Sequence, residues 1–347
     1  MRRFLWALFI LLILPYNKIV WAQPDTTAQA AVLMEAESKR VLFSQNPDQP
    51  LAMASTTKIM TAMVALAYGD LDDTVTVAER AAGLEGSSMY LKAGEEISLE
   101  DLLYGLMLRS GNDAAAAIAI HVAGSEAAFV DLMNGLAYDL GALHTHFENP
   151  HGLPAENHVT SAYDLALLTA YAMEDPRFVE IVSARSHVIE SSEGRRTIAN
   201  KNKLLKNMEG ANGVKTGYTK QAGRCFVGSA TQGDMTLVGT VLNCGPMFEE
   251  CESMLEYGFA NYHMETVMTR ADVPWRRDLY DDAVLLAPMR DLRLPVGEGE
   301  EVVLDPQLPQ AYLFPDAGLA GNVTVRVSGA VAAQWPLYAH IGEEAEP

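Results

Sequence analysis

The chain has 347 residues, of which 49% are hydrophobic and 20% are charged, and its net charge is −20. The composition is that of a folded globular protein, and the length allows one large domain and a smaller one. So acidic a chain is unsuited to nucleic acid, because it would release few counterions from a phosphate backbone. The same charge disfavours broad adsorption to an anionic membrane surface.

The first residues have the pattern of an export signal. Two arginines precede an apolar run over residues 4–14, and the triplet 20–22 fits a small-x-small cleavage site before Gln23. The run is too short for a membrane-spanning helix, and Gln23 is not the cysteine that a lipoprotein anchor needs. Residues 1–22 are therefore predicted to be a signal peptide, and the mature chain is expected in an oxidising compartment.

A hairpin over residues 31–43 and a buried helix come next. The hairpin is predicted to turn near Glu37 and Ser38. The helix runs from Ser55 to about Gly69, and from Ile59 onward its residues are apolar on nearly every side. That composition is typical of a helix inside a large domain.

Ser55 and Lys58 share a face at the start of this helix, because they are three residues apart. A buried lysine is costly unless it is paired or its pKa is shifted. A hydroxyl beside such an amine, at the positive end of a helix dipole, predicts an activated nucleophile. The alternative is a capping serine and a lysine that extends its charge to solvent, and an isolated Ser-x-x-Lys favours that alternative.

A second polar pair is predicted between two helices. A capping box at 98–101 opens a helix that stops at Ser110 and Gly111, and an alanine-rich helix starts at Asn112. Ser110 and Asn112 therefore lie at a tight link, where polar side chains can point into a cleft. Ordinary helix capping is the alternative interpretation.

Further helices are predicted from about 125 to 140 and from the capping box at 161–164, with a loop at 149–154 between them. His151 in this loop could be a general base, but we expect it to satisfy loop backbone groups. The eight histidines show no metal-ligand spacing, so neither a metal nor another cofactor is predicted.

A short strand at 213–217 carries a second cation. If this strand lies beside the Ser55 helix, Lys215 comes within reach of the hydroxyl. Gly217 would let an extended substrate pair with the strand edge, although the same glycine could simply mark a bulge.

The three cysteines follow this strand, in and around a hairpin predicted over 224–231 and 235–242. A disulfide between Cys225 and Cys244 and one between Cys244 and Cys251 are competing expectations, each leaving one thiol over. Small buried hydrophobes without a bridge are an equally weighted alternative. Catalysis by cysteine is not expected. Beyond Tyr262, short apolar runs separated by Pro and Gly predict a small all-β domain.

Three motifs occur in a fixed order: Ser-Thr-Thr-Lys at 55–58, Ser-Gly-Asn at 110–112 and Lys-Thr-Gly at 215–217. Ser44-Gln45-Asn46 is a decoy for the second motif, because it precedes Ser55. The ordered trio resembles the active-site motifs of the low-molecular-mass penicillin-binding proteins, and among them the D-alanyl-D-alanine carboxypeptidases. The resemblance covers roughly residues 31–259 and includes the loops at 86–88, 149–153 and 219–223; the β-rich tail is similar more loosely.

This resemblance implies an α/β (α+β) fold of the transpeptidase and β-lactamase type. An antiparallel sheet flanked by helices would carry an all-helical lobe, with a small all-β C-terminal domain. The expected division is a signal peptide at 1–22, a serine D,D-peptidase domain at 23–262 and a β domain at 263–347.

The resemblance also implies a mechanism, in which Ser55 attacks the peptide bond between two D-alanines of a peptidoglycan stem peptide. Lys58 would be the general base, and Ser110 would relay a proton to the leaving amine. The implied substrate-binding residues are Asn112, Lys215, Thr216, Gly217 and Tyr218, and the backbone N–H groups of Ser55 and Tyr218 would form an oxyanion hole. β-Lactams are expected to acylate Ser55.

Two features depart from the family pattern. Tyr218 stands where many members have histidine, which places side-chain contacts there in doubt. The acidic end at 341–347 is unlike the basic amphipathic helix that anchors some members. An exported periplasmic enzyme without a strong C-terminal membrane anchor is therefore expected, either free or peripheral on the inner membrane.

Three other functions remain open. A β-lactamase would have Ser-Asp-Asn where this chain has Gly111, and no Glu-x-x-Leu-Asn segment is found. A non-catalytic β-lactam sensor would normally bring a signalling span or partner domain. D,D-endopeptidase or transpeptidase action could use the same residues, and the width of the cleft decides between these activities.

Overall fold

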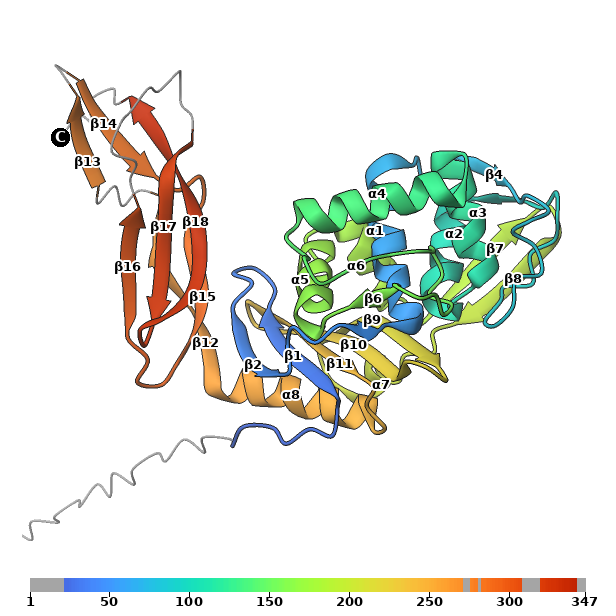
Figure 1. The fold of residues 1–347 in the computed structure, drawn as a ribbon, viewed down its shortest axis with the longest axis horizontal. Coiled ribbons are helices and arrows are strands. Elements are labelled where there is room, and N and C mark those ends of the chain that lie inside the picture. Colours follow the sequence, from blue (N-terminus) through green and yellow to red (C-terminus); the bar gives the residue numbers. More distant parts are fainter. Residues whose placement is uncertain (1–21, 271–274, 280–281, 308–318, 342–347) are drawn as a thin grey trace, which may run out of the picture.

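The protein is described from a computed structural model, whose described residues are 22–270, 275–279, 282–307 and 319–341 (Figure 1). The predicted signal peptide lies outside these ranges except for Ala22, so its cleavage stays a prediction. The acidic end lies outside them from residue 342 onward.

A five-stranded antiparallel sheet forms the centre of the larger body, in the order β2-β1-β11-β10-β9. Both predicted hairpins are confirmed: β1 pairs with β2, and β10 pairs with β11. The predicted short strand at 213–217 is the middle of the longer β9. The strands are β1 (Ala30–Glu35), β2 (Val41–Gln45), β9 (Ala211–Thr219), β10 (Gly223–Gln232) and β11 (Met235–Leu242).

Helices cover both faces of this sheet (Figure 1). One face packs against α1 and α5 in the larger core, and the other packs against α8 in a separate core. Every residue of β1 is buried, and so are most residues of β11. This is expected for strands in the middle of a sheet that is covered on both faces. The helices are α1 (Lys58–Tyr68), α5 (Ala162–Ala172), α6 (Pro176–Ser183), α7 (Leu204–Asn207) and α8 (Met247–Asn261).

The helical lobe holds the segment between β2 and α5. Its elements are β3 (Leu51–Ala52), the 3₁₀ turn η1 (Ala54–Thr57), β4 (Thr74–Thr76), β5 (Glu96–Ser98), α2 (Leu99–Tyr104), the π-helical turn η2 (Gly105–Arg109), α3 (Asn112–Ala123), α4 (Glu126–Asp139) and β6 (Val159–Thr160). Strands β7 (Ser186–Ser191) and β8 (Gly194–Ala199) extend β4 and β5 into a four-stranded sheet.

Two helix boundaries differ from the sequence prediction. The helix predicted from Ser55 begins at Lys58, and Ser55 lies in the 3₁₀ turn before it. The helix that starts after Ser98 changes to a π-helical turn at Gly105. Its N-cap is as predicted, since Ser98 Oγ accepts a hydrogen bond from Asp101 N.

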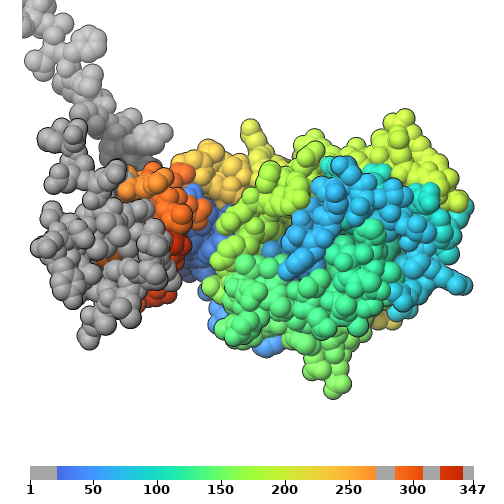
Figure 2. All heavy atoms as spheres, turned by 90° about the horizontal axis from the view of Figure 1, so that it is seen from above, coloured from blue at the N-terminus to red at the C-terminus, as the bar shows by residue number. Residues whose placement is uncertain are grey.

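The change of character predicted at Tyr262 is confirmed, because α8 ends at Asn261 and β12 begins at the next residue. The remaining strands are β12 (Tyr262–Met268), β13 (Trp275–Leu279), β14 (Asp282–Ala287), β15 (Leu292–Gly297), β16 (Val302–Gln307), β17 (Leu319–Val327) and β18 (Ala330–Ile341). They form sheets β12-β15 and β13-β14-β18-β17-β16. Figure 2 shows the atoms of this part of the chain that are coloured orange to red beside the larger body.

A partly buried ion pair joins the two bodies. Arg40 in the β1–β2 turn makes a bidentate pair with Glu300, at 2.6 and 2.9 Å, and also donates to the Pro295 carbonyl. Bidentate geometry fixes direction as well as distance. The β-rich strands are therefore attached to the N-terminal hairpin as well as to α8.

Neither expected disulfide is present, because all three cysteines are free and buried. Cys225 faces the core on the α1 side of the sheet, whereas Cys244 and Cys251 belong to the core on the α8 side. Cys244 Sγ donates to Glu250, and Cys251 Sγ donates to the Gly239 carbonyl. Burial raises the thiol pKa to about 11 for Cys225 and about 12 for the other two, so the alternative of buried hydrophobes is confirmed.

No single helix in the described ranges has the length and apolar composition to cross a membrane. The bent pair α3 and α4 meets those criteria when the two are taken together.

Candidate active site

The turn that carries Ser55 is held from two sides. Thr57 Oγ1 donates to the Ala54 carbonyl at 2.8 Å and lies 2.7 Å from His158 Nε2. His158 Nδ1 accepts from Glu148 N, so Nε2 carries the proton and donates to Thr57. Burial lowers the His158 pKa to about 4, which keeps this ring neutral.

The loop at 149–153 packs directly on this turn. Gly152 has φ +87°, and a Cβ there would lie 2.0 Å from the Ala54 carbonyl oxygen. Only glycine therefore allows the loop this approach. Ser55 itself is half-buried, so its hydroxyl remains accessible from the cleft.

Lys58 is fully buried and points at Ser55. Its Nζ lies 3.2 Å from Ser55 Oγ and 2.8 Å from Asn112 Oδ1, and it also donates to the His151 carbonyl. No carboxylate in the described part of the chain forms an ion pair with it. Burial first, and then the nearby Lys215, hold the pKa of this amine well below its usual value.

Ser110 and Asn112 reach the same site from the end of η2 and the start of α3. Ser110 has φ +65°, and its buried Oγ has no hydrogen-bond partner among the described residues. Asn112 gives its side-chain oxygen to Lys58, while its Nδ2 donates to the Glu85 carbonyl. Their interpretation as cleft residues is thus supported by position.

Gly111 between them has a steric reason to lack a side chain. A Cβ there would lie 2.8 Å from Asp113 Oδ1 and 2.9 Å from Met89 Cγ. Asp113 in turn fastens the loop at 83–94, because it accepts from Ser88 Oγ and from the backbone N–H groups of Met89 and Leu91. This loop forms the wall of the site next to Asn112.

The opposite wall is β9. Lys215 is buried on this strand, and its Nζ donates to the Thr216 carbonyl at 3.0 Å. A Cβ on Gly217 would lie 3.1 Å from Ser55 N, so the strand and the Ser55 turn are in close contact. Burial, together with Lys201, lowers the Lys215 pKa to about 7. Thr216 is half-buried and Tyr218 is 66% exposed on the same strand.

Lys201 is a site residue that the motifs did not reveal. Its Nζ lies 3.4 Å from Ser87 Oγ, and its backbone N–H donates to the Leu108 carbonyl. It acts on both buried lysines, since its charge lowers the pKa of Lys58 and of Lys215. Lys201 belongs to no sequence motif, so its position near the two buried lysines can be recognised only from the folded structure.

His151 has the backbone role expected of it, because its Nδ1 accepts from Leu153 N. Its carbonyl also receives Lys58, a contact that sequence does not reveal. Burial lowers its pKa to about 4, so the ring is neutral. In the described ranges no three His, Cys, Asp or Glu side chains gather as a metal site would require.

The arrangement brings all three motifs into one cleft. A half-buried serine hydroxyl 3.2 Å from a buried amine of lowered pKa, with a second lysine on an adjacent strand, is an arrangement that suits a serine hydrolase. Lys201 and, below its pKa of about 7, Lys215 contribute positive charge to the site. It therefore suits an anionic group next to the bond that reacts.

Comparison with known proteins agrees with this class. Residues 17–245 match the family model described as D-alanyl-D-alanine carboxypeptidase. The chain belongs to this family of serine peptidases, the low-molecular-mass penicillin-binding proteins.

Two relatives illustrate the similarity in sequence. D-alanyl-D-alanine carboxypeptidase DacA of Haemophilus influenzae is 35% identical over 80% of this chain and 75% of its own length. DacF of Bacillus subtilis is 34% identical over 70% of this chain, and the match spans 65% of that protein.

Solved structures agree over nearly the whole chain. Penicillin-binding protein 5 from H. influenzae has a TM-score of 0.79 and 30% identity, and the match covers 92% of this chain and 98% of that structure. Penicillin-binding protein 6B from Escherichia coli has a TM-score of 0.71 and 28% identity, covering 92% and 97%. The expected α+β fold with a C-terminal all-β part is thereby confirmed.

Proposed function

We propose that this chain removes the terminal D-alanine from peptidoglycan stem pentapeptides through an acyl-enzyme on Ser55. The single observation that carries the proposal is the contact between the Ser55 hydroxyl and the buried Lys58 amine, at 3.2 Å, beside Lys215 on β9. The same acylation would make β-lactams covalent inhibitors. The residue roles below belong to this proposal.

The first half of the reaction forms the acyl-enzyme. The neutral Lys58 amine takes the Ser55 proton as the oxygen attacks the carbonyl carbon between the two D-alanines. The backbone N–H groups of Ser55 and Tyr218 stabilise the oxyanion, each by a few kcal/mol. The C–N bond then breaks, and a proton passes through Ser110 to the leaving amine, which gives the unpartnered Ser110 hydroxyl a use.

The second half releases the product. Water attacks the ester carbonyl and gives a proton to the Lys58 amine. The bond from the carbonyl carbon to the Ser55 oxygen then breaks, Lys58 returns the proton to that oxygen, and the shortened peptide leaves as a carboxylic acid that ionises. During both halves Asn112 would hold the substrate amide, and Lys215 with Thr216 would hold the terminal carboxylate. Gly217 keeps the edge of β9 open to an extended peptide.

The four alternative activities can be distinguished by the reactions that the protein carries out on penicillin and on peptidoglycan peptides. Rapid turnover of penicillin would favour a β-lactamase, and labelling without D-alanine release would favour a sensor. Cleavage of cross-linked dimers would favour an endopeptidase, and transfer to an added amine would favour a transpeptidase. The space around Gly111 opposes the β-lactamase, since an aspartate there would meet Met89 and Asp113.

The direct test measures D-alanine release from a sugar-free stem pentapeptide, together with labelling by fluorescent penicillin. Release with slow penicillin turnover is the expected result. Labelling without release would contradict the proposal. We also expect the activity in the periplasmic fraction, which follows from the predicted export and can be measured by fractionation.

The pH dependence of the free enzyme should follow Lys215. This amine is cationic below its pKa of about 7 and neutral above it, so its attraction for a carboxylate is lost as pH rises. We expect kcat/KM to fall by about tenfold per pH unit on the alkaline side. Lys58 does not cause the fall, because a general base gains activity when it loses its proton as pH rises.

Lys215→Arg provides the check, because arginine stays charged throughout this range. The alkaline limb with its midpoint near pH 7 should vanish from the kcat/KM profile of the variant, whatever its absolute activity. An unchanged limb would assign the titration to another group.

Lys201→Gln should move the same limb to higher pH. Removing this neighbouring positive charge raises the pKa of Lys215, because a like charge disfavours the protonated amine. Lys203→Gln is the matched control. Lys203 follows Lys201 by two residues and is also exposed, but its amine lies over the Phe248 ring. Equal profiles for the two variants would remove Lys201 from the site.

A further inference from the structure

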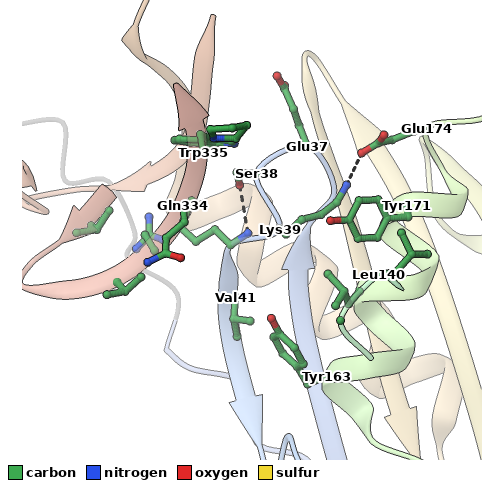
Figure 3. Close-up of a pocket in the computed structure, with 18 of the residues that line it drawn as sticks. Glu37, Ser38, Lys39, Val41, Leu140, Tyr163, Tyr171, Glu174, Gln334 and Trp335 are labelled. Carbon is green, nitrogen blue, oxygen red and sulfur yellow. Dashed lines mark hydrogen bonds and ion pairs between the residues drawn. The ribbon is translucent and has the colours of Figure 1, made fainter. Parts of the chain in front are cut away.

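A second cavity lies far from Ser55, between the two bodies of the protein. It encloses about 800 Å³ between the β1–β2 turn, helix α5 and the β17–β18 hairpin. Figure 3 shows Tyr163 and Tyr171 on one side, Gln334 and Trp335 on the other, and the turn residue Lys39 between them. This volume is within the range of small-molecule binding sites.

The walls are aromatic but not sealed. Tyr163, Tyr171 and Trp335 are each half-buried, so part of every ring remains accessible. Such rings offer an apolar face on which the C–H face of a sugar can stack, and a polar edge that can hydrogen-bond a hydroxyl. Opposed aromatic walls therefore fit a flat, polyhydroxylated ring.

The charges around the cavity are largely paired with one another. Lys39 Nζ lies 2.6 Å from Glu174 and 4.5 Å from the centre of the Tyr171 ring. Arg40 is paired with Glu300. Glu37 and the exposed Arg290 add one charge of each sign. The lining thus offers many hydrogen-bonding groups with little net charge, which suits a neutral polar ligand better than a strongly charged one.

An extended peptide is a poorer fit. The edge strand β2 contributes only Val41 to the lining. Residues 330–336 of β18 also line the cavity, but they already pair with β17 on one side, and Pro336 has no N–H to donate. The cavity therefore favours a ligand that is recognised by stacking and by side-chain hydrogen bonds.

The position relative to Ser55 indicates a polymer. β2 and β9 are the two edges of one five-stranded sheet, so four strand spacings of about 4.8 Å, roughly 19 Å, separate them. The cavity opens at the β2 edge and the active site at the β9 edge. A repeating chain can reach both, whereas a single stem peptide is held at one.

We propose that this cavity binds the glycan chain of peptidoglycan, a neutral run of N-acetylated aminosugars, while a stem peptide enters the Ser55 cleft. This inference rests on the proposed function, since it concerns the same polymeric substrate. Stacking on Tyr163, Tyr171 and Trp335 supplies affinity, and the amide of Gln334 supplies hydrogen bonds to sugar hydroxyl or N-acetyl groups.

A filling substitution tests the site without disturbing a core. Val331 is 56% exposed and lines the cavity, so Val331→Trp places an indole in the space that the sugar would occupy. Val303→Trp is the matched control, because Val303 is 46% exposed on β16 and does not line the cavity. Thermal melting confirms that both variants fold.

The probe is a neutral oligosaccharide of N-acetylglucosamine, and its binding is measured by calorimetry on the whole chain. We expect wild type and Val303→Trp to bind equally and Val331→Trp to bind at least about tenfold more weakly. D-alanine release from a sugar-free pentapeptide should be the same in all three. Absence of binding to wild type, or equal binding to Val331→Trp, would overturn the inference.

The two proposals fail separately in this design. If the oligosaccharide binds as expected but no D-alanine is released, the proposed function fails and the glycan site stands. If D-alanine is released at equal rates but the oligosaccharide does not bind, the glycan site fails alone.

Discussion

Ser55→Ala should abolish labelling by penicillin and lower D-alanine release by at least about 10⁴-fold. Every covalent step of the proposed reaction passes through this oxygen, and within the described ranges no other hydroxyl has a buried amine such as Lys58 at 3.2 Å. Ser110 cannot replace it as nucleophile, because its hydroxyl is buried at the side of the cleft. Radiolabelled or fluorescent penicillin and a coupled D-alanine assay measure the two effects.

Ser44→Ala is the control for this experiment. Ser44 belongs to the decoy Ser-x-Asn at 44–46 and is exposed on β2, at the opposite edge of the sheet. It should label and hydrolyse as wild type does. Residual stoichiometric labelling of the Ser55→Ala protein would show that another residue is acylated.

Lys58→Met should slow acylation by about 10³-fold, which is the scale of a lost general base. Methionine nearly conserves the volume of the buried side chain but has no amine to take the Ser55 proton. Burial and Lys215 lower the pKa of this amine and so favour its neutral form, which is the form that acts as a base. The rate of penicillin labelling under pseudo-first-order conditions measures acylation alone.

Lys39→Met is the matched control, since burial also lowers the pKa of Lys39, but that lysine pairs with Glu174 away from the cleft. Its acylation rate should be unchanged. If Lys58→Met were acylated at the wild-type rate, the base would have to be another group, and the mechanism would need a different proton acceptor.

The sequence was informative wherever a local pattern decides structure. The periodicity of 31–43 and 224–242 predicted two hairpins of the central sheet, and hydroxyl N-caps at Ser98 and Ser161 predicted two helix starts. The order of the three motifs predicted which segments meet around Ser55. The hairpins and the N-caps depend on residues that are close in sequence. The meeting of the three segments depends on the ordered trio of motifs that the chain shares with a known family.

What escaped prediction depends on contacts between distant residues. Lys201 reaches the site only because its backbone bonds to Leu108, and the His151 carbonyl meets Lys58 only through the Gly152 approach. The two disulfide alternatives were wrong and the unbridged alternative was right. Cys225 and Cys244 lie in cores on opposite faces of the sheet, which proximity in sequence does not reveal. The π-helical turn before Ser110 likewise has no pattern of its own.

The pairing of β1 with β11 bears on when activity can arise. Ala30 lies opposite Leu242, so the sheet that supports β9 cannot close until more than two hundred residues after its first strand have been delivered. Contacts of such long sequence separation form slowly. A chain that still lacks the residues up to Leu242 therefore cannot close this sheet, and its Ser55 site stays incomplete.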